Sequence, residues 1–390
     1  MRIDEIRRHL TEDIIPFWKN LKDNGFGGFY GAMDFDLKLY QKADKGCILN
    51  SRILWFFSNA FMTLGDQECL ACAKHAYEFL KTAFYDKENG GVYWSVTYDG
   101  RPGDDTKHTY NQAFAIYALS SYYGASKDTE ALKLAYALVE KVETACKDEG
   151  GYMEAFDRSF KPASNEKLSE NGVMAGRTMN TLLHVYEAYT ELYRVDKKPE
   201  IAAYLEEMLD TFAEKVYNPE KRILEVFFDR NWNSLADLNS YGHDIEASWL
   251  IDRGVEVLGS RKYEEKIYPI TKELAAHIFE VALDEASLFN ECEAGIVDTK
   301  KVWWVQAEAV LGFINAYRKD PSRKDYLEMA GRIWDYIAEY MIDKRKGSEW
   351  FNELHQDGTP ITAKEIVGPW KCPYHNGRMC FELINKNIAL

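Results

Sequence analysis

Two kinds of helix alternate along the chain, and they differ in how far the apolar residues extend around each helix. Around Asp325–Lys344, apolar side chains recur at helical spacing with charged residues between them, and Glu130–Lys147 behaves in the same way. This pattern is typical of a helix that buries one face. In contrast, Val302–Tyr317, Cys47–Leu64 and His108–Tyr123 are apolar on nearly every side, which predicts complete burial.

Short segments rich in glycine and aromatic residues separate these helices and recur about every 60 to 75 residues. A period of this size indicates a repeated supersecondary unit. In each unit the amphipathic helix precedes the turn and the apolar helix follows it. The clear and weaker copies are Gly27–Gly31, Gly90–Trp94, Gly150–Met153, Leu224–Asp229, Ser287–Glu291 and Gly347–Glu353.

The alternation predicts roughly twelve helices in two concentric rings, an all-α (α/α)6 barrel with six apolar helices inside and six amphipathic helices outside. The Gly/aromatic turns are expected to form short hairpin-like structures at the mouth of the barrel. No Pro/Ser-rich linker interrupts the pattern, so residues 1–390 are expected to form a single catalytic domain. The alternative is an open helical solenoid, which should carry polar caps at both ends; the sequence has none.

Composition narrows the functional classes. The formal net charge of −15 argues against nucleic acid or an anionic membrane as a partner. The first ten residues lack an apolar signal core, and no apolar run reaches the ~20 residues of a membrane span. There are seven cysteines, and the isolated Cys69-x-x-Cys72 is interpreted as helix packing. We therefore expect a cytoplasmic protein without a metal site. We also expect a monomer, with a dimer as the alternative.

The few polar residues of the predicted inner helices lie mostly in the first two turns. If the inner helices run parallel, these turns meet at one mouth, where six helix N-termini also favour an oxyanion. Adjacent residues on a helix point about 100° apart, so only one of Trp303 and Trp304 is expected to face the cavity. The candidate site comprises Arg52, Tyr110, Asn180, His184, His243, Glu246, Trp303, Trp304, Glu308, Trp370 and His375.

Several candidates also have a structural interpretation. Arg52 could form an ion pair with Glu246 or Glu308, because a buried charge must be paired. A histidine such as His184, taken alone, is more often a satisfied core residue than a catalyst. His243 and His375 are the stronger candidates, because both lie in polar helix openings at the same mouth. Since imidazole titrates near neutrality, the pair points to proton transfer with a bound substrate.

Five segments carry a resemblance to a known family: Ala43–Gly46 continuing into Ser51–Phe56, Lys107–Asn111, Ser240–Ala247, Val302–Ala309 and Gly368–Arg378. On these segments, and along its whole length, the chain resembles the N-acylglucosamine 2-epimerase family. The resemblance implies an (α/α)6 barrel. It also implies reversible inversion at carbon-2 of the reducing-end sugar of a β-1,4-linked disaccharide, such as cellobiose or lactose, without redox cofactor or metal.

By position, the resemblance makes His243 and His375 the acid/base pair and places the other candidates around the sugar. Carbon-2 becomes acidic only after the ring opens, and loss of its proton leaves an enediolate. Arg52 and His184 can stabilise the oxyanion. The two carboxylates, Glu246 and Glu308, can orient the histidines or assist ring opening, and Trp304 or Trp370 can stack on a sugar.

Other functions stay open at this point. A family member acting on N-acylglucosamine or on another aldose would use the same residues, and keto–aldose isomerisation could accompany epimerisation. A glycoside hydrolase would need two carboxylates across the scissile bond, which Glu246 and Glu308 could supply, but the two histidines at the mouth would then have no role. A sugar-binding protein without activity would need the aromatic residues alone.

Overall fold

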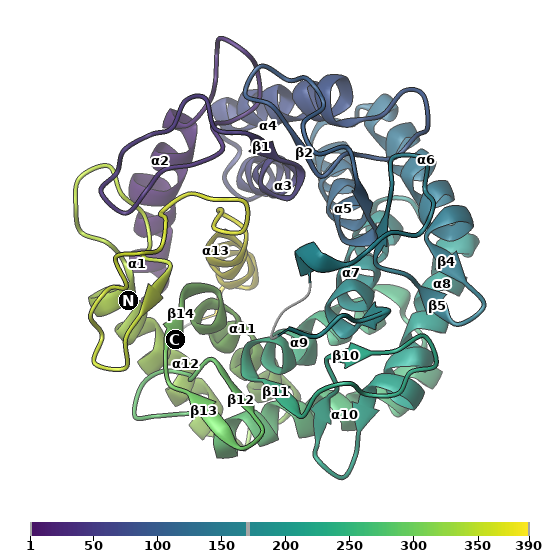
Figure 1. Ribbon diagram of the computed structural model, residues 1–390. Coiled ribbons are helices and arrows are strands. Elements are labelled where there is room, and N and C mark those ends of the chain that lie inside the picture. Colours follow the sequence, from purple (N-terminus) through teal and green to yellow (C-terminus); the bar gives the residue numbers. More distant parts are fainter. Residues whose placement is uncertain (1, 169–171, 389–390) are drawn as a thin grey trace.

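The computed structural model describes residues 2–168 and 172–388, and in this part of the chain the helices form two concentric rings (Figure 1). The inner ring consists of α3 (Cys47–Leu64), α5 (Thr109–Ser126), α7 (Met179–Val195), α9 (Tyr241–Leu258), α11 (Trp303–Lys319) and α13 (His375–Lys386). The outer ring consists of α1 (Arg2–Arg8) with η1 (His9–Ile14) and α2 (Ile15–Asn20), α4 (Gln67–Phe79) with η2 (Leu80–Phe84), α6 (Thr129–Ala145), α8 (Pro199–Thr211) with η4 (Phe212–Val216), α10 (Arg261–Val281), and α12 (Lys324–Tyr336) with η5 (Ile337–Met341).

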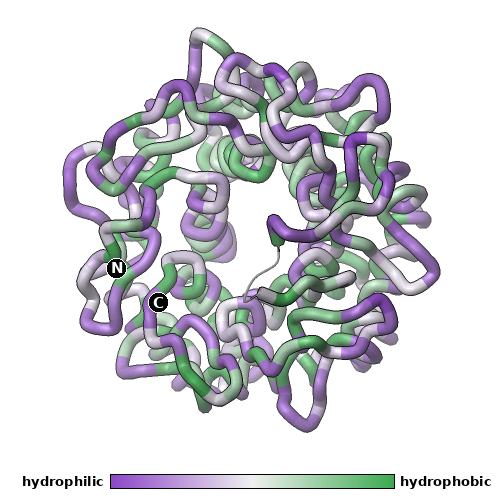
Figure 2. Tube along the Cα trace, in the orientation of Figure 1, coloured by the Kyte–Doolittle hydropathy of each residue, from purple (hydrophilic) through white to green (hydrophobic). Residues whose placement is uncertain are grey.

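The inner ring is closed, because the last inner helix, α13, packs against both α11 and α3. The first and last inner helices, α3 in purple and α13 in yellow, lie side by side in Figure 1. The (α/α)6 prediction is confirmed, and the open solenoid is wrong. Hydrophilic residues dominate the peripheral loops in Figure 2, while hydrophobic stretches follow the helices between them. Over the described residues, no helix is long and apolar enough to span a membrane.

Close packing between inner helices depends on small residues at particular points. Gly254 of α9 faces Tyr186 of α7, and a Cβ atom added there would lie 2.0 Å from the Tyr186 hydroxyl oxygen. That hydroxyl instead donates to the carbonyl oxygen of Ile251 at 2.9 Å. Any larger side chain at position 254 would push the two helices apart.

Every long connection lies at one end of the barrel, because each runs from an outer helix to the next inner helix. Short strands in these connections pair with the following connection around the mouth, in the pairs β1–β2, β3–β6, β7–β10, β11–β12 and β14–β15. An isolated bridge between Met33 and Val367 joins the last connection to the first. The loops at the mouth therefore hold one another in register around the whole ring.

The connections also contain a 3₁₀ turn and several two- or three-residue strands. Their bounds are β1 (Lys45–Gly46), β2 (Ser95–Val96), β3 (Lys107–His108), β4 (Lys147–Asp148), β5 (Gly151–Tyr152), β6 (Ala155–Phe156), η3 (Glu166–Leu168), β7 (Arg177–Thr178), β8 (Tyr217–Asn218), β9 (Ile223–Leu224), β10 (Phe227–Phe228), β11 (Leu238–Ser240), β12 (Glu291–Glu293), β13 (Ile296–Asp298), β14 (Lys301–Val302) and β15 (Glu353–Leu354).

A repeated turn follows each outer helix. Its first residue is an aspartate or asparagine whose side-chain oxygen accepts a hydrogen bond from the backbone N–H two residues later. This is the Asx-turn that Asp and Asn favour. The six turn residues are Asp23, Asp86, Asp148, Asn218, Asp284 and Asp343.

In several units a buried cation attaches this turn to the start of the inner helix. The cation lies two residues before the helix: Lys45 bonds Asp23 at 2.7 Å and Lys107 bonds Asp86 at 2.9 Å. Arg177 and Lys301 pair in the same way with the aspartates of their own units. The sequence analysis did not recognise this motif, although its spacing is regular. Buried ion pairs of this kind fix the mouth loops relative to the inner ring.

The helix boundaries agree with the sequence pattern within a few residues, and Cys47–Leu64 is the same in both. One placement was wrong. Trp370 was expected in the first turns of an inner helix, but α13 begins at His375. Pro369 and Pro373 flank the preceding segment, and residues before proline are biased away from helical geometry.

We predict that Lys45→Met lowers the free energy of unfolding by about 3–5 kcal/mol, because it leaves Asp23 buried without its cation. Urea denaturation monitored by circular dichroism measures the change. Lys74→Met on the exposed face of α4 is the matched control and should shift the value by less than about 0.5 kcal/mol. Equal stability of the two variants would contradict the anchoring role.

Candidate functional site

A cavity of about 560 Å³ opens at the mouth of the barrel. Of the residues predicted for the site, only Glu308 does not line it; this acidic residue is buried behind the histidine of α13. The others all contribute to the wall: Arg52, Tyr110, Asn180, His184, His243, Glu246, Trp303, Trp304, Trp370 and His375. Residues from all six inner helices, or the segments that lead into them, therefore converge on one polar space.

Trp304 contacts both histidines of the predicted acid/base pair. Its ring centroid is 4.9 Å from that of His243 and 5.4 Å from that of His375. Trp303 is buried beside it and contacts His375 edge-on at 5.3 Å. Both tryptophans line the cavity, so the expectation that only one of them faces it was wrong, although Trp304 is the less buried of the two.

Each of these histidines has one ring nitrogen held by the protein. Ser240, the residue before α9, places its hydroxyl oxygen 2.8 Å from Nδ1 of His243. In His375, Nδ1 is 2.7 Å from Oε1 of Glu308. Burial lowers the pKa of His243 to about 3 and that of His375 well below its ordinary value, with further lowering of the latter by Arg378. Both rings are therefore neutral at neutral pH.

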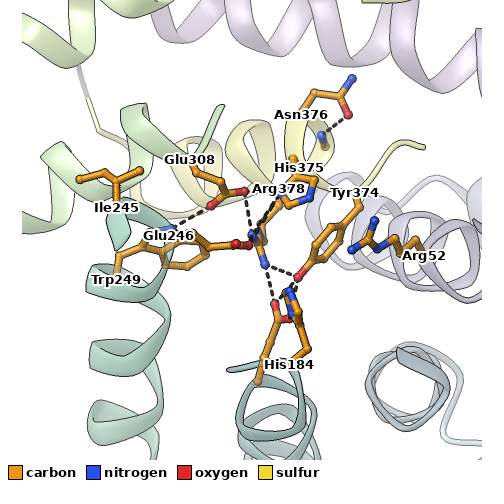
Figure 3. Close-up of polar contacts among 12 residues, drawn as sticks. Arg52, His184, Ile245, Glu246, Trp249, Glu308, Tyr374, His375, Asn376 and Arg378 are labelled. Carbon is orange, nitrogen blue, oxygen red and sulfur yellow. Dashed lines mark hydrogen bonds and ion pairs between the residues drawn. The ribbon is translucent and has the colours of Figure 1, made fainter. Parts of the chain in front are cut away.

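Arg378 of α13 lies at the centre of a buried charge cluster (Figure 3). Its Nη1 donates to Glu187 at 2.5 Å, and its Nη2 donates to Glu246 and, at 2.7 Å, to Glu308. Tyr374 donates its hydroxyl to Glu187 at 2.5 Å. One guanidinium thus binds carboxylates from three other inner helices.

The carboxylates of this cluster differ in their protonation. Burial opposes ionisation of Glu187, but Arg378 and the bonds from His184 and Tyr374 outweigh it and lower the pKa to about 2. Burial and repulsion by Glu308 raise the pKa of Glu246 to about 7. Burial also raises the pKa of Glu308, against the donors Arg378 and Trp249. Of the three carboxylates, Glu246 accepts the fewest hydrogen bonds, so its ionised form is the least stabilised.

Arg52 does not form the ion pair that the sequence allowed. Glu246 and Glu308 are bound by Arg378 instead, and Arg52 has no carboxylate within ion-pair distance in the described part of the chain. Its guanidinium lies 4.2 Å from the ring centroid of Phe114, and it donates to the Tyr110 hydroxyl at 3.1 Å. A cation with this surrounding is available to an anionic group in the cavity.

The remaining predicted residues occupy the wall and the rim. His184 of α7 is held by Glu187 through Nδ1 at 2.9 Å. Oδ1 of Asn180 is buried without a hydrogen-bond partner among residues 2–168 and 172–388. Trp370 is 40% exposed, and its ring lies 5.8 Å from that of Tyr110. This exposed aromatic surface at the rim suits an apolar sugar face.

The sequence analysis did not identify four residues of this cluster: Glu187, Trp249, Tyr374 and Arg378. Trp249 belongs to it because its indole N–H donates to Glu308 at 2.9 Å. A signal existed for two of them. His184 and Glu187 are three residues apart, as are His375 and Arg378, and this spacing places both pairs on one helix face. The convergence of the two faces could not be read from spacing alone.

Glu246, Glu308 and His375 bring possible metal ligands within 4.8 Å of one another. The donor set does not fit a cation, however, because Nη2 of Arg378 already binds both carboxylates. A divalent ion at that position would face a permanently charged guanidinium. The geometry therefore agrees with the metal-free site expected from the sequence.

Comparison with known proteins gives a consistent result. A family profile described as N-acylglucosamine 2-epimerase (GlcNAc 2-epimerase) matches residues 28–377. A cellobiose 2-epimerase of Ruminococcus albus is 53% identical over 390 residues, covering 100% of both chains. Among solved structures, a sugar epimerase from a ruminal bacterium superimposes with a TM-score of 0.99 at 52% identity, covering 100% of both chains. The cellobiose 2-epimerase of Bacillus thermoamylovorans B4167 gives 0.95 at 46% identity, covering 98% of this chain and 99% of that one.

We predict that exhaustive chelation leaves the activity unchanged, because Arg378 occupies the place of a cation between Glu246 and Glu308. Initial rates before and after dialysis against EDTA, with metal content determined by mass spectrometry, measure this. Loss of activity that a single divalent ion restores would contradict the assignment.

Proposed function

The chain belongs to the N-acylglucosamine 2-epimerase family, and on that premise we propose that it is an isomerase that inverts carbon-2 of the reducing-end glucose of cellobiose. Lactose, another β-1,4-linked disaccharide, is expected to be a second substrate. The observation that carries the proposal is the pair of neutral imidazoles, His243 and His375, which both contact Trp304 and line one polar cavity. The names of the similar proteins support the choice of substrate.

Ring opening comes first, because carbon-2 of a closed sugar is not acidic. The ring oxygen must gain a proton and the carbon-1 hydroxyl must lose one. Glu246 lines the cavity, and burial together with repulsion by Glu308 raises its pKa to about 7, so its protonated form can supply the ring oxygen. A neutral histidine can accept the hydroxyl proton.

Inversion then requires proton transfer on both faces of carbon-2. One imidazole removes the carbon-2 proton, which leaves an enediolate. The other imidazole, which accepted the proton of the carbon-1 hydroxyl during ring opening, returns that proton to carbon-2 from the opposite side. Both rings are neutral in the resting site, so either can act first as a base. The same arrangement therefore supports the reaction in both directions.

Negative charge develops on the oxygen of carbon-1 as the proton leaves. Arg52, which has no carboxylate partner in the described residues, can donate two hydrogen bonds to this oxygen and its neighbour. His184 lies beside Tyr110, with ring centroids 5.1 Å apart; since its Nδ1 faces Glu187, its other ring nitrogen can accept a hydrogen bond from a sugar hydroxyl. Trp370 at the rim can stack on the second, non-reducing sugar.

The hydrolase alternative is less compatible with the geometry. A glycosidase needs two carboxyl groups that flank the scissile bond. Glu246 and Glu308 both bind the same Arg378, and Glu308 does not line the cavity. Location in the cytoplasm, a monomeric or dimeric state, and the treatment of residues 1–390 as one catalytic domain stay predictions from the sequence.

In deuterated water, cellobiose is expected to give a glucosyl-mannose disaccharide with deuterium at carbon-2 and an intact glycosidic bond, because the histidine exchanges its proton with solvent. Proton NMR and mass spectrometry of the sugars measure both products and label. Free glucose without an epimer would support a hydrolase, and binding without turnover would support a binding protein. A preference for N-acetylglucosamine would contradict only the choice of a disaccharide as substrate, and the family assignment would stand.

His243→Asn and His375→Asn should each lower the epimerisation rate by roughly 10²–10⁴-fold, because each removes one acid/base group. Each variant should still exchange the carbon-2 hydrogen of one epimer with solvent, since the second base remains on its own face. His277→Asn, on outer helix α10, serves as the control and should keep normal rates. Exchange of both epimers by either variant would argue against a two-base mechanism.

A further inference from the structure

The cluster around Arg378 connects two histidines that lie on different helices. Glu308 binds Nδ1 of His375, and Glu187 binds Nδ1 of His184. Arg378 donates to both of these carboxylates, at 2.7 Å and 2.5 Å. A single guanidinium therefore lies behind two imidazoles of the cavity wall and touches the group that holds each of them.

The donors around these carboxylates indicate which nitrogen of each histidine carries the proton. Arginine and the indole nitrogen of Trp249 can only donate, and both donate to Glu308. Glu187 accepts from Arg378 and from Tyr374. These donors favour the ionised form of each carboxylate, against the burial that favours the neutral form. An ionised carboxylate accepts, and does not donate, at the histidine nitrogen that faces it.

We propose that Arg378 is a positioning residue that holds His184 and His375 in the same tautomer, each with its proton on Nδ1 and its Nε2 unprotonated. The proposal rests on the proposed function in one respect, since the unprotonated Nε2 of His375 is the atom that would remove the carbon-2 proton. Nε2 of His375 has no hydrogen-bond partner among the residues that the structure describes, and the ring lines the cavity.

The charges around His375 explain why Arg378 is needed. Glu308 from α11 and Glu246 from α9 lie 2.7 and 3.8 Å from its Nδ1. The positive or polar groups that face it are Arg52 from α3, His184 from α7, His243 from α9, and Tyr374 and Arg378 from α13. Without Arg378, the neighbouring carboxylates would be largely uncompensated. They would draw a proton onto His375, and an imidazolium cannot act as a base.

Two substitutions separate the geometry of Arg378 from its charge. Arg378→Lys keeps the charge but cannot span three carboxylates with a planar fork, so kcat should fall about 10- to 100-fold. KM should change by less than about threefold, because Arg378 does not line the cavity. Arg378→Met removes the charge, and the pKa of His375 should rise into the neutral range. Arg253→Lys, in the pair with Glu191 farther along α9, is the matched control.

The decisive measurement is the nitrogen-15 NMR spectrum of histidine-labelled protein between pH 6 and 8, assigned with single His→Asn variants. In the unsubstituted protein, both His184 and His375 should be neutral with the proton on Nδ1. In Arg378→Met, His375 should show the imidazolium shift at the low end of this range. If that variant does not fold, Arg378→Lys still tests the proposal through the tautomer populations and the split between kcat and KM.

Two results would overturn the proposal. One is a proton on Nε2 of either ring in the unsubstituted protein. The other is an Arg378→Lys variant whose histidine spectrum and kcat equal those of Arg253→Lys. A protein that places no deuterium in cellobiose would instead contradict the proposed function, and the NMR spectrum would still decide the role of Arg378.

Discussion

A single buried guanidinium, that of Arg378, is the interaction on which the interior of this barrel depends. Isolated carboxylates in a protein interior are destabilising unless a cation and hydrogen bonds compensate them. Glu187, Glu246 and Glu308 come from three helices and are all within reach of this one residue. The same guanidinium therefore constrains the rotation of each of these helices about its own axis, and α13 must be docked before any of the three carboxylates can pair with this cation.

The apolar periodicity was enough to predict the two rings, because burial on all sides or on one side is a property of each helix alone. The position of the polar residues in the first turns of the inner helices was enough to predict a shared mouth. What spacing could not show is how the inner helices are rotated relative to one another. For that reason Arg52 was given Glu246 or Glu308 as an alternative partner, whereas Arg378 binds both.

Trp370 illustrates a second limit. Its sequence neighbours read as the opening of a helix, yet the segment that contains the two prolines forms bends, and the helix begins only at His375. Glu308 is a third case, since its type and helix position were correct but its side chain lies behind His375 rather than on the cavity. In both cases the sequence identified the residue but did not predict its contacts, because those contacts come from distant parts of the chain.

The closed inner ring has a consequence for biosynthesis. Tyr374, His375 and Arg378 all belong to α13 or to the residue before it, and α13 is translated after the other five inner helices. Until it docks between α11 and α3, a nascent chain has an open seam with apolar helix faces and uncompensated acidic groups. Such a partly folded species is the kind that chaperones bind and that aggregates when it is left alone. The catalytic centre can therefore form only in the last step of assembly, when the seam closes.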